Sequence, residues 1–340
     1  SPCLFPSRKQ KRLPRTEHVC PSTSGPQVHA GIDEAGLGPM LGPLCIGWSV
    51  TSSPSRAETL NHWELWSDAV SEENPRKGER LFVADSKRVH DGSARGRGRL
   101  EATALTFLRA AGNPVLCGKD LTESPGPSMR PLELTPAPWL DPWLLTLPIQ
   151  SPEDLLMRQA AALETAMNRS KCRILEAAVR IAPAGELNAS FARTQNKAVT
   201  TWALIAPILK HLWDVYGEQH VAVVLDRQGG RRRYAGLLAQ EFPFCEILIL
   251  SETSELAQYR IQGPGRNMLL TVRPRAEDTS LPVALGSCFA KYARESVMDA
   301  FNSWFAGFQA DLKPTAGYVT DARRWLQDAR PALAQAKVPD

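Results

Sequence analysis

The stretch from Gly31 to Pro39, which reads Gly-Ile-Asp-Glu-Ala-Gly-Leu-Gly-Pro, contains residues well suited to chemistry. Asp33 and Glu34 end an apolar run, and a loop with glycines at 36 and 38 follows them. Adjacent strand residues point to opposite faces, so the two carboxylates converge only where the strand ends or bends, which the glycines permit. Because carboxylate oxygens suit hard divalent cations, the pattern predicts a metal site facing a phosphate. An acidic turn after a strand is the alternative.

A third acid, Asp226, ends the apolar run of residues 221–225. This is the pattern of a buried strand that delivers a carboxylate to the edge of a sheet. Three arginines at positions 231 to 233 follow it and would attract a polyanion.

The tripeptide Asp85-Ser86-Lys87 also follows a short apolar run. Its hydroxyl and ammonium groups are of the kind that hold a phosphate oxygen, although an ordinary turn explains the same residues. Farther along, apolar residues from Phe289 to Trp304 recur at helical spacing and predict an amphipathic helix. Lys291 and Arg294 on that helix are either solvent-side charges or cations near the site.

The composition favours a globular protein with a substantial core, since 43% of its 340 residues are hydrophobic. No apolar run reaches the ~18 residues of a membrane span, and the basic N-terminus lacks the apolar segment of a signal peptide, so we expect a cytoplasmic protein. The seven cysteines are odd in number, scattered and never spaced C-x-x-C. This argues against a disulfide framework and against a zinc site.

The domain organisation expected from the sequence is a single catalytic domain over residues 28–330, with a disordered basic tail at 1–27 and a second tail at 331–340. Prolines interrupt the region around residues 111–170, which we interpret as an insertion. Its Trp139 and Trp143 either pack on the body of the protein or stack on bases. The patterns predict strands over residues 44–50, 174–181, 221–225 and 246–250, and helices within 55–71 and over 99–110, 153–169, 190–216 and 322–333.

Five motifs together resemble the type 2 ribonuclease H family, and ribonuclease HII most closely. In order they are Gly31 to Pro39, Asp85-Ser86-Lys87, the strand ending in Asp226, an acid followed by Ser287 and Ala290-Lys291, and Gly317-Tyr318-x-Thr320-Asp321. The resemblance covers residues 28–110 and 174–330. It implies an RNase H-like α/β fold, a mixed central sheet flanked by helices, with a C-terminal helical part.

The resemblance also implies a two-metal site. Asp33, Glu34, Asp226 and a fourth acid would hold two Mg²⁺ or Mn²⁺ ions. The fourth acid is Glu277 by its position before Lys291, with Asp278 as the alternative. One ion would activate the attacking water and the other would stabilise the leaving 3′ oxygen.

By the same resemblance, the chain is a metal-dependent endoribonuclease of DNA replication and repair. It would cut the RNA strand of RNA-DNA hybrids, including ribonucleotides embedded in duplex DNA, and leave 3′-hydroxyl and 5′-phosphate ends. We expect a monomer whose partner is the hybrid duplex, with no membrane association.

Selection of RNA requires a reader of the 2′-hydroxyl group. In the family the glycine loop contacts the ribose through its backbone and a tyrosine stacks on the adjoining sugar. Gly36, Gly38 and Tyr318 are the corresponding residues here, and Asp85, Ser86 and Lys87 match the family's phosphate-side motif.

Leu37 departs from the family, which usually has arginine at this position of ribonuclease HII. The change removes a cation near the phosphates, a loss of ~1 to 3 kcal/mol where the contact is charge-assisted. Two alternatives stay open: a hybrid-binding relative with weakened catalysis, and an RNase H-like nuclease that acts on branched DNA.

Overall fold

The computed structural model describes residues 27–54, 61–75, 80–113, 115–122, 138–139 and 147–337. The basic tail before residue 27, Trp143 and much of the expected insertion lie outside these ranges. At the other end, α11 (Arg330–Ala336) occupies most of the expected second tail.

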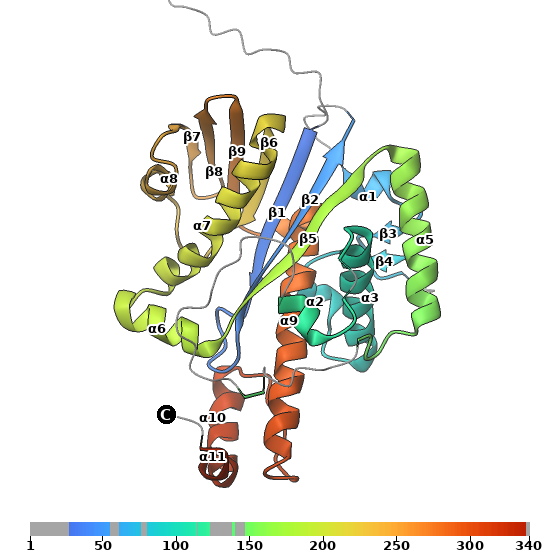
Figure 1. The fold of residues 1–340 in the computed structure, drawn as a ribbon, viewed down its shortest axis with the longest axis vertical. Coiled ribbons are helices and arrows are strands. Elements are labelled where there is room, and N and C mark those ends of the chain that lie inside the picture. Colours follow the sequence, from blue (N-terminus) through green and yellow to red (C-terminus); the bar gives the residue numbers. More distant parts are fainter. Residues whose placement is uncertain are drawn as a thin grey trace, which may run out of the picture.

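A seven-stranded mixed sheet forms the centre of the described part, in the order β5-β2-β1-β6-β9-β8-β7 (Figure 1). Its strands are β1 (Gln27–Ala35), β2 (Leu44–Ser53), β5 (Arg173–Ala182), β6 (Val221–Asp226), β7 (Glu246–Glu252), β8 (Ala257–Gly263) and β9 (Arg266–Arg273). β1 runs parallel to β6, and β6 parallel to β9, whereas the other neighbours are antiparallel. β3 (Val70–Ser71) and β4 (Leu81–Phe82) form a separate pair. The mixed sheet flanked by helices that the sequence predicts is confirmed.

Helices pack on both faces of this sheet. The described helices are α1 (His62–Leu65), α2 (Ser86–Val89), α3 (Ala94–Ala110), α4 (Gly118–Thr122), α5 (Glu153–Ser170), α6 (Ala184–Thr194), α7 (Lys197–Tyr216), α8 (Ala235–Glu241), α9 (Leu281–Ala306), α10 (Val319–Asp328) and α11, with short 3₁₀ turns η1 (Gly217–Gln219) and η2 (Ala276–Asp278). α9 crosses β1, β2 and β5 on one face, and α7 covers β6 and β9 on the other (Figure 1).

The alternation of side chains along β1 divides the core between the two faces. Val28, Ala30 and Ile32 belong to the apolar cluster that contains the buried side chains of α7. Gly31, which points the other way, lies directly against the start of α9. Because each strand shows one face to each helix layer, the even and odd residues of β1 have different neighbours.

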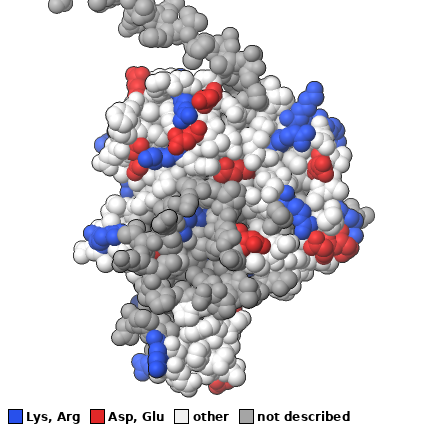
Figure 2. All heavy atoms as spheres, in the orientation of Figure 1, with Lys and Arg blue, Asp and Glu red and all other residues white. Residues whose placement is uncertain are grey.

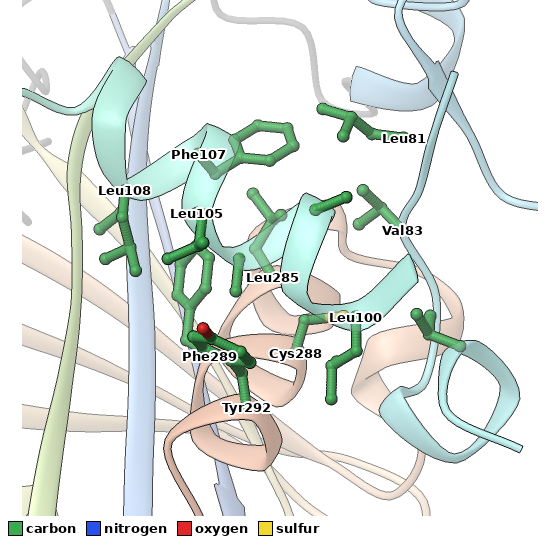
Figure 3. Close-up of a cluster of buried hydrophobic side chains, with 14 of the residues drawn as sticks. Leu81, Val83, Leu100, Leu105, Phe107, Leu108, Leu285, Cys288, Phe289 and Tyr292 are labelled. Atoms are coloured by element: carbon green, nitrogen blue, oxygen red, sulfur yellow. The ribbon is translucent and has the colours of Figure 1, made fainter. Parts of the chain in front are cut away.

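The second core lies between α9 and α3 (Figure 3). Leu285, Cys288, Phe289 and Tyr292 of α9 meet the apolar side chains of α3 there, all nearly inaccessible to solvent. The apolar side chains of α9 thus contact both the sheet and α3. The helical spacing predicts the helix itself, whereas its packing on α3 was not predicted.

The C-terminal helices pack on the far end of α9. A third cluster joins Phe301 and Phe305 of α9 to Trp325 of α10 and Ala332 of α11. Trp139 packs edge to face on Phe301, with ring centroids 5.1 Å apart. Of the two uses considered for Trp139, packing on the body is therefore the one observed.

Two of the expected helices are each divided in the structure, and one hairpin was not predicted. The single helix expected over residues 190–216 is two helices, because Gln195 has a left-handed conformation (φ 49°) and Asn196 caps α7 through its side chain. The hairpin β8–β9 was not predicted, although residues 263–265, Gly-Pro-Gly, mark its turn. The single helix expected over residues 322–333 is also two helices, α10 and α11, which meet at Ala329. The short helix expected within 55–71 is confirmed, in the described part, as the four residues of α1.

Two further expectations concern membranes and cysteines. Among the described residues, no helix combines the length and the apolar character needed to cross a bilayer.

All five cysteines of the described ranges are free, and Cys45, Cys172 and Cys288 are buried. For these five, the prediction of unpaired thiols is confirmed.

Candidate active site

The predicted acids lie close to the carboxyl ends of three neighbouring strands, β1, β6 and β9. β1 pairs with β6 only as far as Ile32 and Leu225, so Asp33 and Asp226 are the next residues on adjacent strands. η2, which carries Glu277, follows directly on β9, and β9 pairs with β6 up to Asp226. In sheets with parallel strands, ligands bind at the carboxyl ends of the strands.

Asp33 and Glu34 lie near these strand ends without the expected bend between them. β1 stays paired with β2 through Ala35, so the strand neither ends nor turns at the two acids. Asp33 faces α9, where Ser287 is close enough to its carboxylate to lower the pKa of Asp33. Glu34 points to the opposite face, and each of the two carboxylates is still close enough to Asp226 to repel it.

The electrostatics of the cluster favour protonation or neutralisation by a cation. Burial, followed by the negative charges of Glu34 and Asp226, raises the pKa of Asp33 well above its usual range. Burial, Asp226 and Glu277 raise the pKa of Glu34 to about 8, with Lys87 opposing the shift. Like charges in a partly dehydrated site raise one another's pKa in this way.

The structure separates Glu277 from its alternative, Asp278. Asp226 accepts a 2.9 Å hydrogen bond from the backbone N–H of Ala276, which holds η2 against the end of β6. Burial and the charge of Asp226 raise the pKa of Glu277 to about 7. Asp278 instead forms an ion pair with Arg275 at 2.5 Å. Glu277 is therefore the member of this pair that joins the cluster.

The Asp85-Ser86-Lys87 motif lies beside the acids. The carboxylate of Asp85 caps α2 by accepting the backbone N–H of Lys87 at 3.0 Å. Ser86 is buried, and its Oγ lies 3.0 Å from Ser287 Oγ. The exposed ammonium of Lys87 is close enough to lower the pKa of both Glu34 and Asp226. The motif is a helix start that also brings a cation to the carboxylates.

Tyr318 and Lys87 line the same cleft, whose volume is about 580 Å³. Tyr318 is 53% exposed and precedes α10. The guanidinium of the buried Arg294 lies 5.9 Å from the centre of its ring. Tyr318, which is expected to stack on a sugar, is thus accessible to a ligand in the cleft that Lys87 also lines.

The glycine loop, residues 36–43, follows β1. Gly36 has φ +108°, and a Cβ there would lie 2.3 Å from the carbonyl oxygen of Pro43. A Cβ at Gly38 would have no atom within 4 Å, and its φ is not in the left-handed region. Gly36 is therefore required by the conformation of the loop, whereas Gly38 leaves open space beside the backbone. Leu37 and Leu187 pack against the apolar cluster beneath α7.

A divalent cation fits this donor set, although the carboxylates do not form a ready-made cage. Glu34 Oε2 and Glu277 Oε2 are buried without a hydrogen-bond partner. In the described ranges, no three His, Cys, Asp or Glu side chains are grouped closely enough to hold a metal ion. Mg²⁺ typically keeps several waters and is bound by one or two carboxylates together with substrate phosphates. The acids are of the right chemistry for such an open site.

Two features of the site were not recognised in the sequence. Arg294 was left undecided between solvent and site, and it is 2% exposed and hydrogen-bonded to two loops. Gly286 lies inside α9, where a Cβ would be 2.7 Å from the carbonyl oxygen of Gly47. A glycine within a helical pattern is the available signal, because it marks close backbone contact.

Comparisons with known proteins find similarities among solved structures. No protein-family model and no curated protein matches the sequence. Ribonuclease H2 from Pyrococcus horikoshii OT3 is 14% identical with a TM-score of 0.37, and the match covers 92% of this chain and 90% of that one. RNase HII of Archaeoglobus fulgidus, solved as a complex with PCNA, is 13% identical with a TM-score of 0.37 over 92% and 91% of the two chains. Bst-RNase HIII in complex with Mn²⁺ is 14% identical with a TM-score of 0.36 over 93% and 72%. At such TM-scores, we infer nothing about activity from these similarities.

The side of the molecule shown in Figure 2 is not uniformly basic where its residues are described. On the side shown in Figure 2, lysines and arginines are interspersed with aspartates and glutamates. Lys87 and the arginines at 231 to 233 remain the local groups expected from the sequence to attract a polyanion.

Proposed function

We propose that this chain is a metal-dependent endoribonuclease that hydrolyses the RNA strand of RNA-DNA hybrids, including ribonucleotides embedded in duplex DNA. The observation that carries the proposal is the convergence of Asp33, Glu34, Asp226 and Glu277 near the carboxyl ends of β1, β6 and β9, with Lys87 beside them. The five ordered motifs of the sequence support the same assignment.

The residues divide into those that hold metal and those that hold substrate. Asp33, Glu34, Asp226 and Glu277 would bind Mg²⁺ or Mn²⁺, which, when bound, activates water and stabilises the leaving oxygen. Ser287 is close enough to Asp33 to lower the pKa of its carboxylate, against the larger effect of burial.

The substrate side is formed by the glycine loop, Lys87 and Tyr318. Gly38 has open space beside its backbone, so a ribose can approach the loop closely. Lys87 supplies a positive charge for a phosphate oxygen, and the exposed ring of Tyr318 offers a surface on which a sugar can stack.

The test compares cleavage of a duplex with one ribonucleotide, a long hybrid and an all-DNA duplex, each with Mg²⁺, Mn²⁺ or chelator. We expect metal-dependent cleavage of the two ribonucleotide-containing duplexes, with 3′-hydroxyl and 5′-phosphate products. Asp226→Asn should abolish cleavage while circular dichroism stays that of the wild type. Cleavage of all-DNA branched junctions, or full activity of Asp226→Asn, would refute the proposal.

A hybrid-binding relative with weakened catalysis is the second candidate, and the packing of Leu37 favours it. Leu37 contributes to the apolar cluster beneath α7 and offers no cation to a phosphate. Salt-sensitive binding of the hybrid without any product would support this candidate.

A further inference from the structure

Arg294 is enclosed within the protein although it carries a charge. It lies on α9, is 2% exposed, and donates from Nη2 to the carbonyl oxygens of Leu41 at 3.0 Å and Ala316 at 3.1 Å. Leu41 belongs to the glycine loop, and Ala316 to the segment 315–318 that ends in Tyr318, here called the tyrosine loop. One guanidinium therefore joins the two loops.

The two loops also contact each other directly. The backbone N–H groups of Met40 and Leu41 donate to the carbonyl oxygen of Gly317 at 2.8 and 3.1 Å. A Cβ at Gly317 would lie 2.3 Å from the carbonyl oxygen of Leu41 and 3.1 Å from Arg294 Nη2. Arg294 thus adds side-chain hydrogen bonds to a direct backbone contact between the glycine loop and the tyrosine loop.

Arg294 also meets the functional part of each loop. A Cβ at Gly36 would be 3.1 Å from Arg294 Nε, and this Nε is buried without a hydrogen-bond partner. On the other side, the guanidinium lies over the ring of Tyr318 at 5.9 Å, a distance suited to a cation–π contact. The residue therefore lies between the glycine that shapes one loop and the aromatic ring that ends the other.

We propose that Arg294 is a positioning residue that sets the discrimination between ribose and deoxyribose by fixing the glycine loop against Tyr318. The inference rests on the proposed function, in which these two loops read the sugar. Reading a single hydroxyl group requires that its contacts be held within fractions of an ångström. A planar guanidinium can hydrogen-bond two carbonyls while it stacks on a ring, whereas a lysine ammonium is a single point charge.

The experiment compares Arg294→Met and Arg294→Lys with the wild type and with Arg180→Met. Arg180 is a matched control because its guanidinium is also largely enclosed, and it binds both carboxylate oxygens of Glu186 at 2.8 Å, outside the two loops. Each protein is assayed for binding and Mg²⁺-dependent cleavage of a duplex with one ribonucleotide and of the matching all-DNA duplex. Hydrogen–deuterium exchange of residues 36–43 and 315–318 is measured on the same samples.

We expect Arg294→Met to lose about tenfold in selectivity for the ribonucleotide, the effect of losing a charge-assisted hydrogen bond. Exchange should rise in both loops and not in the rest of the chain. Arg294→Lys should recover part of the selectivity, and Arg180→Met should keep the wild-type value. A merely structural role would lower the stability of Arg294→Met without changing its selectivity.

Wild-type selectivity in Arg294→Met would overturn the inference even if total activity fell. If Arg294→Met does not fold, the selectivity of Arg294→Lys is the test. Wild-type selectivity in Arg294→Lys would then overturn the inference. A wild-type protein that neither binds nor cuts the ribonucleotide duplex would refute the proposed function itself, and this inference with it. The two failures are therefore distinguishable.

Discussion

Without a bound metal ion, the buried acids of the candidate site lower the stability of the fold. Burial and the neighbouring acids raise the pKa of Asp33, Glu34 and Glu277, so the charged forms of all three are unfavourable here. Lys87 is a nearby cation that offsets part of the repulsion. Strongly perturbed acids gathered at one place are more typical of functional sites than of folding cores.

The structure leads to a test of which acid is the fourth member of the cluster. Glu277→Gln should lower metal-dependent cleavage by about two orders of magnitude, because it removes a charged group aimed at the reacting centre. Asp278→Asn should keep most of the activity, since Asp278 is paired with Arg275. Initial cleavage rates and the Mn²⁺-induced rise in Tm check both. An inactive Asp278→Asn beside an active Glu277→Gln would reverse the assignment.

The two glycines of the loop should respond differently to substitution. Gly36→Ala introduces a Cβ 2.3 Å from a backbone oxygen at φ +108°, so we expect a loss of ~1 to 3 kcal/mol in the free energy of unfolding. Gly38→Ala meets no atom within 4 Å and should leave stability unchanged. Chemical denaturation measures both variants. Equal stability losses would show that the loop conformation is not what the structure describes.

At the scale of elements, α9 connects the cluster of acids to the glycine loop and the tyrosine loop. Ser287 and Arg294 are seven positions apart along it, about two turns, and so lie on the same side of the helix. Ser287 contacts Asp33, and Arg294 holds the two loops. The position of α9 against the sheet therefore controls both groups at once.

The close approach of α9 to the sheet can be tested with Gly286→Ala. The new Cβ would lie 2.7 Å from the carbonyl oxygen of Gly47 and 3.2 Å from the backbone N of Asp33, and such overpacking costs ~1 to 3 kcal/mol. The ~1 kcal/mol gained from alanine in a helix offsets only part of this. We expect a lower Tm together with lower activity, because Ser287 moves away from Asp33.

Gly98→Ala on α3 is the control for that substitution. Its Cβ would meet only the Cβ of Gln150, at the ordinary contact distance of 3.7 Å. This variant should gain up to ~1 kcal/mol from helix propensity alone. Thermal and urea denaturation compare the two, and a stabilised Gly286→Ala would contradict the packing described here.

The sequence predicts elements better than it predicts contacts between them. The apolar runs that end in Asp33 and Asp226 are strands, and the helical spacing from Phe289 onward is α9, because local periodicity determines these elements. The burial of Arg294 could not be predicted from local periodicity. Its partners are carbonyl groups more than twenty residues distant along the chain, and backbone carbonyls carry no sequence signal. The sequence therefore predicts the acids, the glycine loop, Lys87 and Tyr318, but not the contact that Arg294 makes with both loops.

At the scale of the whole molecule, a buried carboxylate ties the sheet to α7. Glu176 of β5 is 7% exposed and accepts hydrogen bonds from Trp48 Nε1 at 2.5 Å and Tyr216 OH at 3.1 Å. His211 Nε2 of α7 lies 2.9 Å from the same carboxylate. One strand of the sheet and its covering helix are thus linked by polar groups within an otherwise apolar layer, where each unpaired group would cost free energy.

This link should make the stability of the fold depend on pH through His211. The hydrogen bond to Glu176 raises the pKa of His211 above its ordinary value in the folded protein. A histidine with a raised folded pKa stabilises the fold fully below its unfolded pKa of about 6.5 and loses that contribution as pH rises through the folded value.

Burial acts in the opposite direction on His29 and His62, whose pKa values are lowered, so the effect of His211 must be isolated by comparison. We expect His211→Gln to lose more stability relative to the wild type at about pH 5.5 than at about pH 9, on either side of the histidine range. Urea denaturation at both pH values measures the difference. An equal loss at the two values would mean that Glu176 holds the layers together without help from a protonated histidine.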